Sequence, residues 1–477
     1  MLPRWSPYLL ALLAHGLSLP GIFVFDDYSL LAQPVELTHL LRLEQTRPLT
    51  YLTFWLNQAL GGWHLLNLAG HLLCLWLLDR IARRLLPPDI ASVPAILFAV
   101  HPLLSEPVQY IFARSSLLAT LFCLAALDAW TRQKHWTAVA WFLPALLAKE
   151  ECVAFPLALI LLRPQWPPIA AMLALSAAAG LRVLYATKVV AGAGSGFEAG
   201  VSPGQYFLAQ GLVLWGYLLR LVLPYGLTLD PPAPTPNLEA SVLGWVALLV
   251  LTGLLLWRGH PAGRWFVIGI ILLLPSSSFL PAADLVAWRR LYLPMTAFCL
   301  ATAYLLPRRA VVPIIAILSI LSGLRAVAWR DEAGLWREAA AAAPAKLRPR
   351  LQLARLAPPS EALAILTEAE QIAPGDPQIA SSKGRAYLQQ NDAPRALAEF
   401  GRALAQRPDN PQCHPQPRRG AGSAGPSRCR QGRLPPGTRP GPVPSASPSK
   451  PAASRRTLTA MCTDQLTWEM LVLKRNK

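Results

Sequence analysis

Apolar runs separated by short polar loops dominate the chain from residue 5 to residue 328. Many of these runs approach the roughly 20 residues that an α-helix needs to cross a bilayer. The pattern therefore predicts an all-α membrane domain over residues 1–330, a polytopic helix bundle with about eleven spans. The predicted spans are 5–23, 63–79, 90–104, 114–130, 136–148, 152–163, 167–186, 240–257, 265–281, 292–307 and 311–328.

Basic residues in the loops give this bundle a direction. Arg83 follows the second predicted span, Arg132 the fourth, Arg163 the sixth, Arg258 the eighth and Arg308 the tenth. Lys and Arg gather in the cytoplasmic loops of membrane proteins. If these loops face the cytoplasm, the N-terminus is cytoplasmic and the part after the last span lies outside. The expected location is the cell inner membrane, with the C-terminal part in the periplasm.

Two apolar segments call for a separate interpretation. The run 8–25 has the apolar character of a signal peptide but lacks a small-residue cleavage site before Asp26, so we expect an uncleaved span. The run 206–223 would break the alternation of basic loops if it crossed the membrane. Because it carries aromatic and basic side chains typical of an interface, we expect it to lie flat at the outer surface.

A 34-residue repeat follows the apolar region and predicts a second domain at residues 331–410. The sequence Glu361-Ala-Leu-Ala recurs 34 residues later as Arg395-Ala-Leu-Ala. This period is that of the tetratricopeptide repeat, a pair of helices. Gly384 then falls at the small-residue position of one clear copy, and a weaker copy precedes it at about 343–376. We expect about two such repeats, on the non-cytoplasmic side.

The repeat pattern stops at Pro411. Residues 411–477 are rich in Pro, Arg, Gly and Ser, show no hydrophobic periodicity, and hold twelve Lys/Arg against two Asp/Glu. A segment of this composition is expected to be disordered. The abrupt change favours a shift of reading frame, and a natural extension is the alternative.

Composition and charge exclude several classes of function. The chain is 53% hydrophobic and 15% charged, whereas a soluble protein has about 25% charged residues. Of the net charge of +18, the tail after residue 410 carries +10, and most of the rest lies in short loops between apolar runs. That placement is the positive-inside pattern, so we expect no nucleic-acid partner. The seven cysteines have no C-x-x-C spacing, which argues against a disulfide framework or a zinc site.

The side chains that can carry chemistry fall mostly in loops expected on the outer face. Asp26 and Asp27 directly follow the first predicted span and have apolar and aromatic neighbours. Partial desolvation there raises the pKa of a carboxyl group toward the range of a general base. The alternative is that the pair only caps or solvates the end of a helix.

Other outer segments carry candidate ligands for an anionic substrate group. A guanidinium fork matches the oxygens of a phosphate, and an ammonium group supplies a point charge. The alternatives are helix capping and snorkelling of long basic side chains to the interface. No metal site is assigned. The candidate substrate-binding or carrier-binding residues are His101, Glu106, Arg114, Lys149, Glu150, Arg289, Arg290 and Tyr292.

These residues belong to an ordered series of short motifs that resembles a known family. After Asp26-Asp27 come Arg47-Pro-Leu-Thr-Tyr-Leu-Thr-Phe, His64-Leu-Leu-Asn-Leu, His101-Pro, Glu106-Pro, Arg114-Ser-Ser-Leu-Leu-Ala, Ala148-Lys-Glu and Arg290-Leu-Tyr-Leu-Pro. The series is similar to that of the transmembrane and tetratricopeptide-repeat O-mannosyltransferases and their bacterial relatives, in the GT-C glycosyltransferase superfamily. The resemblance covers about residues 20–410.

The resemblance implies a GT-C-like fold in which a sugar, mannose in that family, passes from a polyprenyl-phosphate carrier to an acceptor hydroxyl. It gives Asp26 and Asp27 the acidic catalytic role, and we expect a larger loss for Asp27→Asn than for Asp26→Asn. The lipid carrier is one expected partner, and an acceptor protein bound through the repeats is the other. A membrane scaffold without activity and a lipid transporter are the rival classes. Polar residues are sparse within the spans, which argues against a transporter.

Overall fold

The computed structural model describes residues 3–19, 21–32, 34–189, 202–234, 237–277, 279, 281–282 and 284–406. Regular structure in these residues is helical, which confirms the predicted all-α class. Contacts divide the chain into two compact units, Met1–Pro374 and Gly375–Lys477. The division falls between the two predicted repeats, whereas the sequence placed a domain boundary after residue 330.

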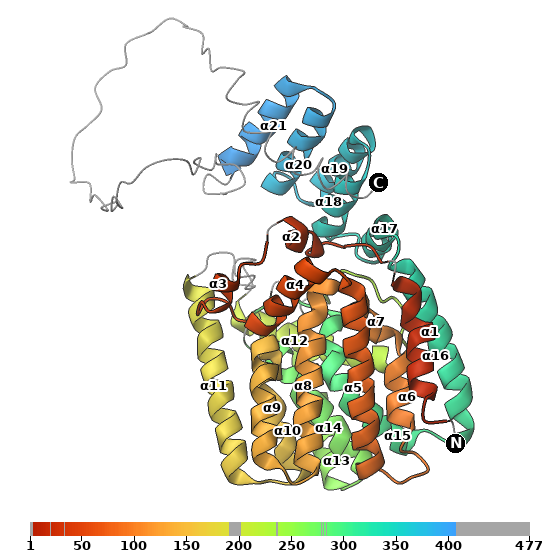
Figure 1. Ribbon diagram of the computed structural model, residues 1–477. Coiled ribbons are helices and arrows are strands. Elements are labelled where there is room, and N and C mark those ends of the chain that lie inside the picture. The colour runs from red at the N-terminus through yellow and green to blue at the C-terminus, as the bar shows by residue number, and fades with distance from the viewer. Residues whose placement is uncertain are drawn as a thin grey trace, which may run out of the picture. The chain divides into compact units, whose positions relative to one another are not determined.

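The first unit holds the membrane bundle and the first pair of repeat helices (Figure 1). Its α-helices are α1 (Ser6–His15), α2 (Asp27–Ala32), α3 (Leu37–Leu40), α4 (Pro48–Leu60), α5 (Trp63–Leu85), α6 (Val93–Val100), α7 (Ser105–Gln109), α8 (Arg114–Thr131), α9 (His135–Ala148), α10 (Phe155–Leu162), α11 (Trp166–Val189), α12 (Pro203–Val222), α13 (Leu238–Trp257), α14 (Pro261–Leu273), α15 (Tyr292–Leu305), α16 (Arg308–Ala328), α17 (Glu332–Ala342), α18 (Leu347–Leu356) and α19 (Pro359–Ile372). Short 3-10 helices are η1 (Gly16–Ser18), η2 (Pro102–Leu104), η3 (Ile111–Ala113), η4 (Glu150–Ala154), η5 (Leu274–Ser277) and η6 (Trp288–Leu291).

Every predicted span contains a helix, but the helices differ in length. Among the described residues, five stretches are long and apolar enough to cross a bilayer: Trp63–Leu85, Ile111–Thr131, Trp166–Ala186, Leu238–Trp257 and Arg308–Ala328. An eight-residue helix such as α6 or α10 is only about 12 Å long, against a hydrocarbon core of about 30 Å. Pro102 follows the end of α6 and Pro156 lies in the first turn of α10, where a missing N–H prevents extension. The other predicted spans correspond to shorter apolar helices, such as His135–Ala148 and Pro261–Ser277, so the count of about eleven crossings stays a prediction.

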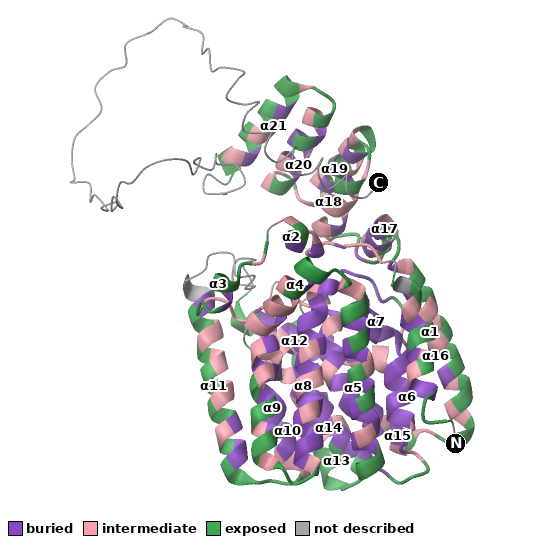
Figure 2. Cartoon of the chain, viewed as in Figure 1, coloured by how far each residue is buried: buried purple, intermediate pink, exposed green. Residues whose placement is uncertain are grey.

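The long helices form an inner and an outer group. The buried share of the most hydrophobic 18 residues is 61% in α5 and 72% in the stretch Ile111–Thr131. It is only 17% in α11 and α13 and 22% in α16. Buried residues fill the middle of the bundle, while α11 and α16 are mostly exposed or half-buried (Figure 2). The exposed residues of this outer group include Leu249 of α13 and Ile317 and Ile320 of α16. Apolar surface of this extent marks contact with lipid, which identifies a membrane protein.

Helix α12 lies across one end of the bundle. Near its start, the Tyr206 hydroxyl donates to the Ser276 carbonyl (2.8 Å). Near its end, the Leu221 carbonyl contacts Nε2 of His101 (3.1 Å). His101 follows α6 and Ser276 follows α14, and these two helices end at the same end of the bundle. A 20-residue helix is about 30 Å long, so a crossing helix would not reach that end twice. These contacts agree with a helix that lies along one end of the bundle, and the placement of 206–223 flat at the membrane surface stays a prediction.

The predicted basic loops meet at one end of the bundle, here called the basic end. Arg80, Arg84 and Arg132 all pair with Asp128, at 3.2, 3.1 and 3.1 Å. These side chains come from α5 and from the end of α8, which gathers loops that the sequence places 48 residues apart. The opposite end holds α2, α4 and α12 and is called the acid-pair end, because Asp26 lies there (Figure 1).

Helices α17 and α18 pack on the acid-pair end. The Tyr28 hydroxyl donates to Glu332 at 2.7 Å, and the Lys346 ammonium pairs with Asp230 at 2.7 Å. Trp336 of α17 is fully buried in a cluster that includes Val24. These contacts explain why the first repeat pair belongs to the same compact unit as the bundle.

The described part of the second unit is a hairpin of α20 (Pro377–Gln389) and α21 (Ala393–Gln406). Gly384 lies so close to Phe400 that a Cβ atom there would be 2.8 Å from the ring. Only glycine permits that approach, which confirms its predicted place at the small-residue position of a repeat. The tail predicted to be disordered, 411–477, lies outside the described residues.

Candidate functional site

Asp26 lies half-buried in the loop before α2, at the acid-pair end. Its Oδ2 accepts a hydrogen bond from the Tyr110 hydroxyl at 3.0 Å, and its Oδ1 has no partner among the described residues. Burial raises the pKa of Asp26, while the hydrogen bond from Tyr110 and the charge of Arg289 offset part of the rise. A carboxylate with a raised pKa and an open oxygen has the properties of a general base.

Asp27, in contrast, is fully buried. Its Oδ1 accepts the backbone N–H of Phe112 at 2.8 Å, and its Oδ2 accepts that of Val24 at 3.2 Å. Burial raises the pKa of Asp27 to about 8, although these N–H groups lower it in part. Asp27 therefore connects the loop before α2, which contains Asp26, to the segment before α8. We expected the larger catalytic role for Asp27, whereas in the structure Asp27 is buried and Asp26 is the partly exposed member of the pair.

The backbone at Phe25, directly before the acid pair, has an unusual conformation. Its φ is +51°, a left-handed conformation that few residues other than glycine adopt. Such a conformation persists only where the surrounding packing holds it. The Phe25 ring packs edge-on against Trp336 of α17, with centroids 5.6 Å apart, and Val24 beside it is fully buried. The aromatic flanks of the acid pair thus anchor the loop.

Arg289 connects two acids next to Asp26. Its guanidinium donates to Glu106 at 3.0 Å and to Asp284 at 2.6 Å. Burial raises the pKa of Glu106, and the charge of Arg289 lowers it in part. Asp284 also accepts from Arg348 of α18 at 2.6 Å. The charge of Arg289 is therefore already balanced within the protein.

A second charged cluster surrounds η4. Nε of Arg47 donates to Glu150 at 2.9 Å, and a second N–H of the same guanidinium reaches the other carboxylate oxygen. Burial disfavours ionised Glu150 and is the largest single influence, but the charge and hydrogen bonds of Arg47, with the charge of Lys149, together outweigh it and lower the pKa of Glu150 to about 2. Lys149 pairs with Glu151 at 2.6 Å and donates to the Ser116 hydroxyl at 2.8 Å. Two cations and two anions make this cluster neutral.

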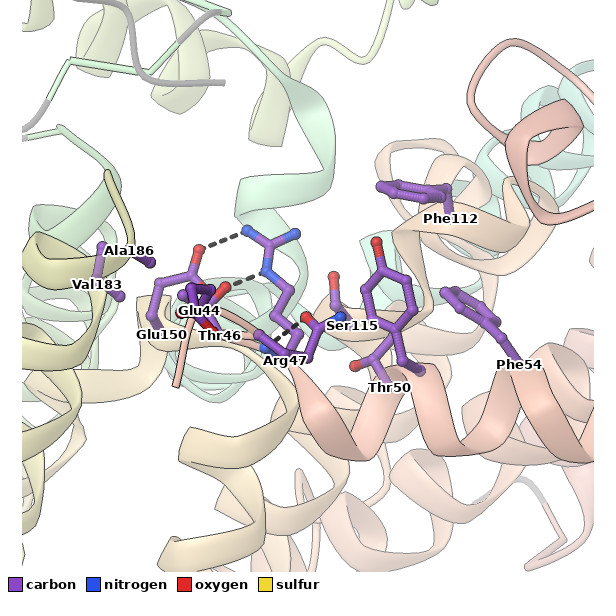
Figure 3. Close-up of a pocket in the computed structure, with 12 residues that line it drawn as sticks. Glu44, Thr46, Arg47, Thr50, Phe54, Phe112, Ser115, Glu150, Val183 and Ala186 are labelled. Carbon is purple, nitrogen blue, oxygen red and sulfur yellow. Dashed lines mark hydrogen bonds and ion pairs between the residues drawn. The ribbon is translucent and has the colours of Figure 1, made fainter. Parts of the chain in front are cut away.

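A cavity of about 290 Å³ opens beside this cluster. Figure 3 shows Arg47, Phe112 and Ser115 facing one space from three different segments. The wall formed by Phe112 is also connected to the acid pair, because the Phe112 N–H donates to Asp27. The residues that give the cavity its chemistry are Arg47, Tyr51, Phe54, Phe112, Ser115 and Glu150.

Four other predicted site residues serve the packing of the bundle in this structure. His101 caps η2 and contacts α12. Buried Arg114 donates to Asn67 at 2.6 Å and to two backbone carbonyls. Arg290 donates to backbone carbonyls of the 284–285 loop. Tyr292 is fully buried and its hydroxyl lies 2.7 Å from His71. The structure thus groups Asp26 with Glu106 and Arg289, and Lys149 with Glu150. No hydrogen bond or ion pair joins these four to either group among the described residues, although the charge of Arg290 acts on Glu151 beside the second group.

Three residues that bind Asp26 or the partners of Arg289 were not among the site residues predicted from the sequence: Tyr110, Asp284 and Arg348. Tyr110 had a local signal, because it lies one helical turn after Glu106. Asp284 and Arg348 had none, since their partners are distant in the sequence or lie in the repeat region. Among the described residues, no group of three or more His, Cys, Asp and Glu side chains is arranged to hold a metal ion.

These features define the class of protein: a helical membrane protein with paired charged clusters at one end, followed by tetratricopeptide-type helical pairs. The comparisons agree. The tetratricopeptide repeat family model matches residues 359–415. The Caenorhabditis elegans protein O-mannosyl-transferase F38B6.6 is 26% identical over 360 residues, which is 65% of this chain and 50% of that protein. Human protein O-mannosyl-transferase TMTC3 is 36% identical over 120 residues, 22% of this chain and 13% of that protein.

The curated homologues of this chain are thus named protein O-mannosyl-transferases, which confirms the resemblance seen in the sequence. A third, Drosophila melanogaster protein O-mannosyl-transferase Tmtc1, is 34% identical over 120 residues, 22% of this chain and 14% of that protein. The chain matches half of the length of the worm protein and a smaller share of the others. No solved structure gives a significant match.

Proposed function

We propose that this chain is a membrane glycosyltransferase that moves a sugar, mannose by the names of its relatives, from a polyprenyl-phosphate carrier to a protein hydroxyl. The observation that carries the proposal is the half-buried Asp26, with one oxygen held by Tyr110 and the other open. The names of the curated homologues support the reaction class.

In the proposed reaction, Asp26 acts as the general base. The acceptor hydroxyl attacks the anomeric carbon, the bond from that carbon to the phosphate oxygen breaks, and the proton of the hydroxyl moves to Oδ1 of Asp26. The phosphate leaves on the lipid carrier with the bonding electron pair. Asp27 is a positioning residue, because it holds the loop that aims Asp26. Arg289 has the strongest influence of any nearby charge on Asp26 and offsets negative charge at the site.

The reaction is tested with membranes that contain the full chain. We expect transfer of labelled mannose to protein from polyprenyl-phosphate mannose and none from nucleotide-linked mannose, because the base lies at the end of the bundle away from the cytoplasmic basic loops. Transfer from the nucleotide donor alone would overturn the carrier assignment. Absence of transfer from both donors would favour the scaffold alternative, in which the repeats only bind a partner.

The proposed orientation places the basic end in the cytoplasm and the acid-pair end on the outer side of the inner membrane. The cluster around Asp128 supports it, since positively charged loops stay on the cytoplasmic side. We expect a phosphatase reporter inserted after Arg84 to be inactive and one inserted after Gly375 to be active in the periplasm. The opposite pair of signals would reverse the orientation and place Asp26 in the cytoplasm.

In this orientation the repeat helices lie on the same side as Asp26. Tetratricopeptide-type pairs stack to form binding surfaces for protein segments. We therefore propose that the acceptor protein is recognised by this region while its hydroxyl reaches the acid-pair end.

A further inference from the structure

The cavity beside η4 has aromatic walls. The rings of Tyr51 and Phe54 meet edge-on with centroids 5.6 Å apart, and Phe54 and Phe112 stack at 6.1 Å. Small-ligand sites combine such apolar walls with a few well-placed polar groups, in volumes of about 300–1,000 Å³. At about 290 Å³ the cavity lies at the lower limit of that range. Its size suits a single small ring.

The polar groups of the cavity supply both donors and acceptors. Two of the five N–H donors of Arg47 bind Glu150, so three remain for a ligand. The Glu150 oxygens also keep lone pairs that can accept further hydrogen bonds. Ser115 adds a hydroxyl to the lining of the same space (Figure 3). A ligand that carries several hydroxyl groups can donate to the carboxylate and accept from the guanidinium together. The pyranose ring of a hexose has that pattern, with C–H faces for the aromatic walls.

The charge of the cavity opposes a phosphate. Its charged lining consists of Glu44, Arg47 and Glu150, two acids and one base. The neighbouring Lys149 is neutralised by Glu151. A phosphate placed here meets two carboxylates and one guanidinium that is already engaged, and like charges at short range repel strongly where water is partly excluded. An uncharged ligand meets no such repulsion.

The cavity also adjoins the acid pair. Phe112 lines the cavity with its ring and donates its backbone N–H to Asp27. Tyr51, on another wall, lies close enough to Asp26 for the carboxylate charge to help raise the pKa of its hydroxyl, although burial is the larger cause. A ring held in the cavity therefore lies next to the proposed base.

We infer that this cavity holds the uncharged hexose ring of the donor, with Arg47 and Glu150 binding its hydroxyls and Phe112 packing on its face, while the carrier phosphate stays outside. The inference rests on the proposed function. It reassigns Glu150, which the sequence grouped with carrier ligands, to the sugar.

The test separates sugar contacts from phosphate contacts. The full chain is assayed with polyprenyl-phosphate mannose as donor and with sugar-free polyprenyl phosphate as competing inhibitor. We expect Glu150→Gln and Phe112→Leu to raise the donor KM by about tenfold or more, since each removes a contact to the ring. The inhibition constant of polyprenyl phosphate should stay within about twofold of wild type, because that lipid carries no sugar. Asp331→Asn, an exposed acid of the same unit, is the control.

Two results would overturn the assignment. Equal increases in the donor KM and in the inhibition constant would mean that the cavity binds the phosphate. No change in either for folded variants would mean that the donor does not enter it. Phe112→Leu keeps the test valid if Glu150→Gln leaves Arg47 uncompensated and fails to fold.

A binding measurement distinguishes failure of this inference from failure of the proposed function. The wild-type chain in lipid nanodiscs is titrated with methyl α-mannopyranoside, followed by saturation-transfer NMR, and separately with inorganic phosphate, followed by the broadening of its ³¹P signal beyond that seen with empty nanodiscs. Binding of the glycoside that is lost in Phe112→Leu supports the sugar site even if no transfer is found. Binding of phosphate without the glycoside overturns it, whether or not the chain transfers sugar.

Discussion

Asp26→Asn should lower the rate of sugar transfer by a factor of about 10²–10⁴, the usual loss when a general base is removed. Asparagine keeps the size of the side chain and can accept the Tyr110 hydroxyl, so the loop should fold as before. What it loses is an oxygen able to take a proton from the acceptor. The rate is measured with saturating donor in membranes that contain equal amounts of each variant.

The pH profile provides a second measure of the same role. The hydrogen bond from Tyr110 favours ionised Asp26, so Tyr110→Phe should raise the carboxyl pKa further. Because a base works in its deprotonated form, the acidic limb of the rate profile should move to higher pH. Asp331→Asn should leave both the rate and the profile unchanged. If Asp26→Asn transferred sugar at the wild-type rate, Asp26 would not be the general base. The acid pair would then only cap or solvate the end of a helix.

Arg289→Met should destabilise the fold by about 3–5 kcal/mol, the usual cost of removing one partner of a buried ion pair. The reason is Glu106, whose side chain is only 6% exposed and which depends on Arg289 for a counter-charge. The effect is read as a fall in the unfolding temperature of the purified protein in detergent. Arg337→Met, which breaks an exposed pair with Asp331, should change stability by less than about 1 kcal/mol.

A double variant separates a structural role of Arg289 from direct phosphate binding. Glu106→Gln removes the charge that Arg289 compensates, so adding it to Arg289→Met should restore much of the lost stability. If Arg289 instead acted chiefly as a phosphate ligand, Arg289→Met would keep the wild-type unfolding temperature and raise the donor KM. That result would return Arg289 to the role that the sequence suggested.

The sequence alone determined the class of fold and the position of the acid pair along the chain. Apolar runs of membrane length and the alternation of basic loops are local, additive signals, so they predicted the helical bundle, the flat helix α12 and the basic end around Asp128. The 34-residue period predicted the hairpin at Gly384, because each repeat of that length folds as one pair of packed helices. The adjacent carboxylates Asp26 and Asp27 were recognisable as unusual beside an apolar span.

Only the tertiary structure decided how these parts are used. Span lengths were overestimated because hydropathy does not register where proline ends a helix, as at Pro102. The different surroundings of Asp26 and Asp27 follow from the backbone turn at Phe25 and from an N–H donor on a segment 85 residues away. The pairings of Glu106 with Arg289 and of Arg47 with Glu150 join residues 183 and 103 positions apart. Such contacts depend on which helix faces pack together, and that choice is made by the whole core rather than by any local pattern.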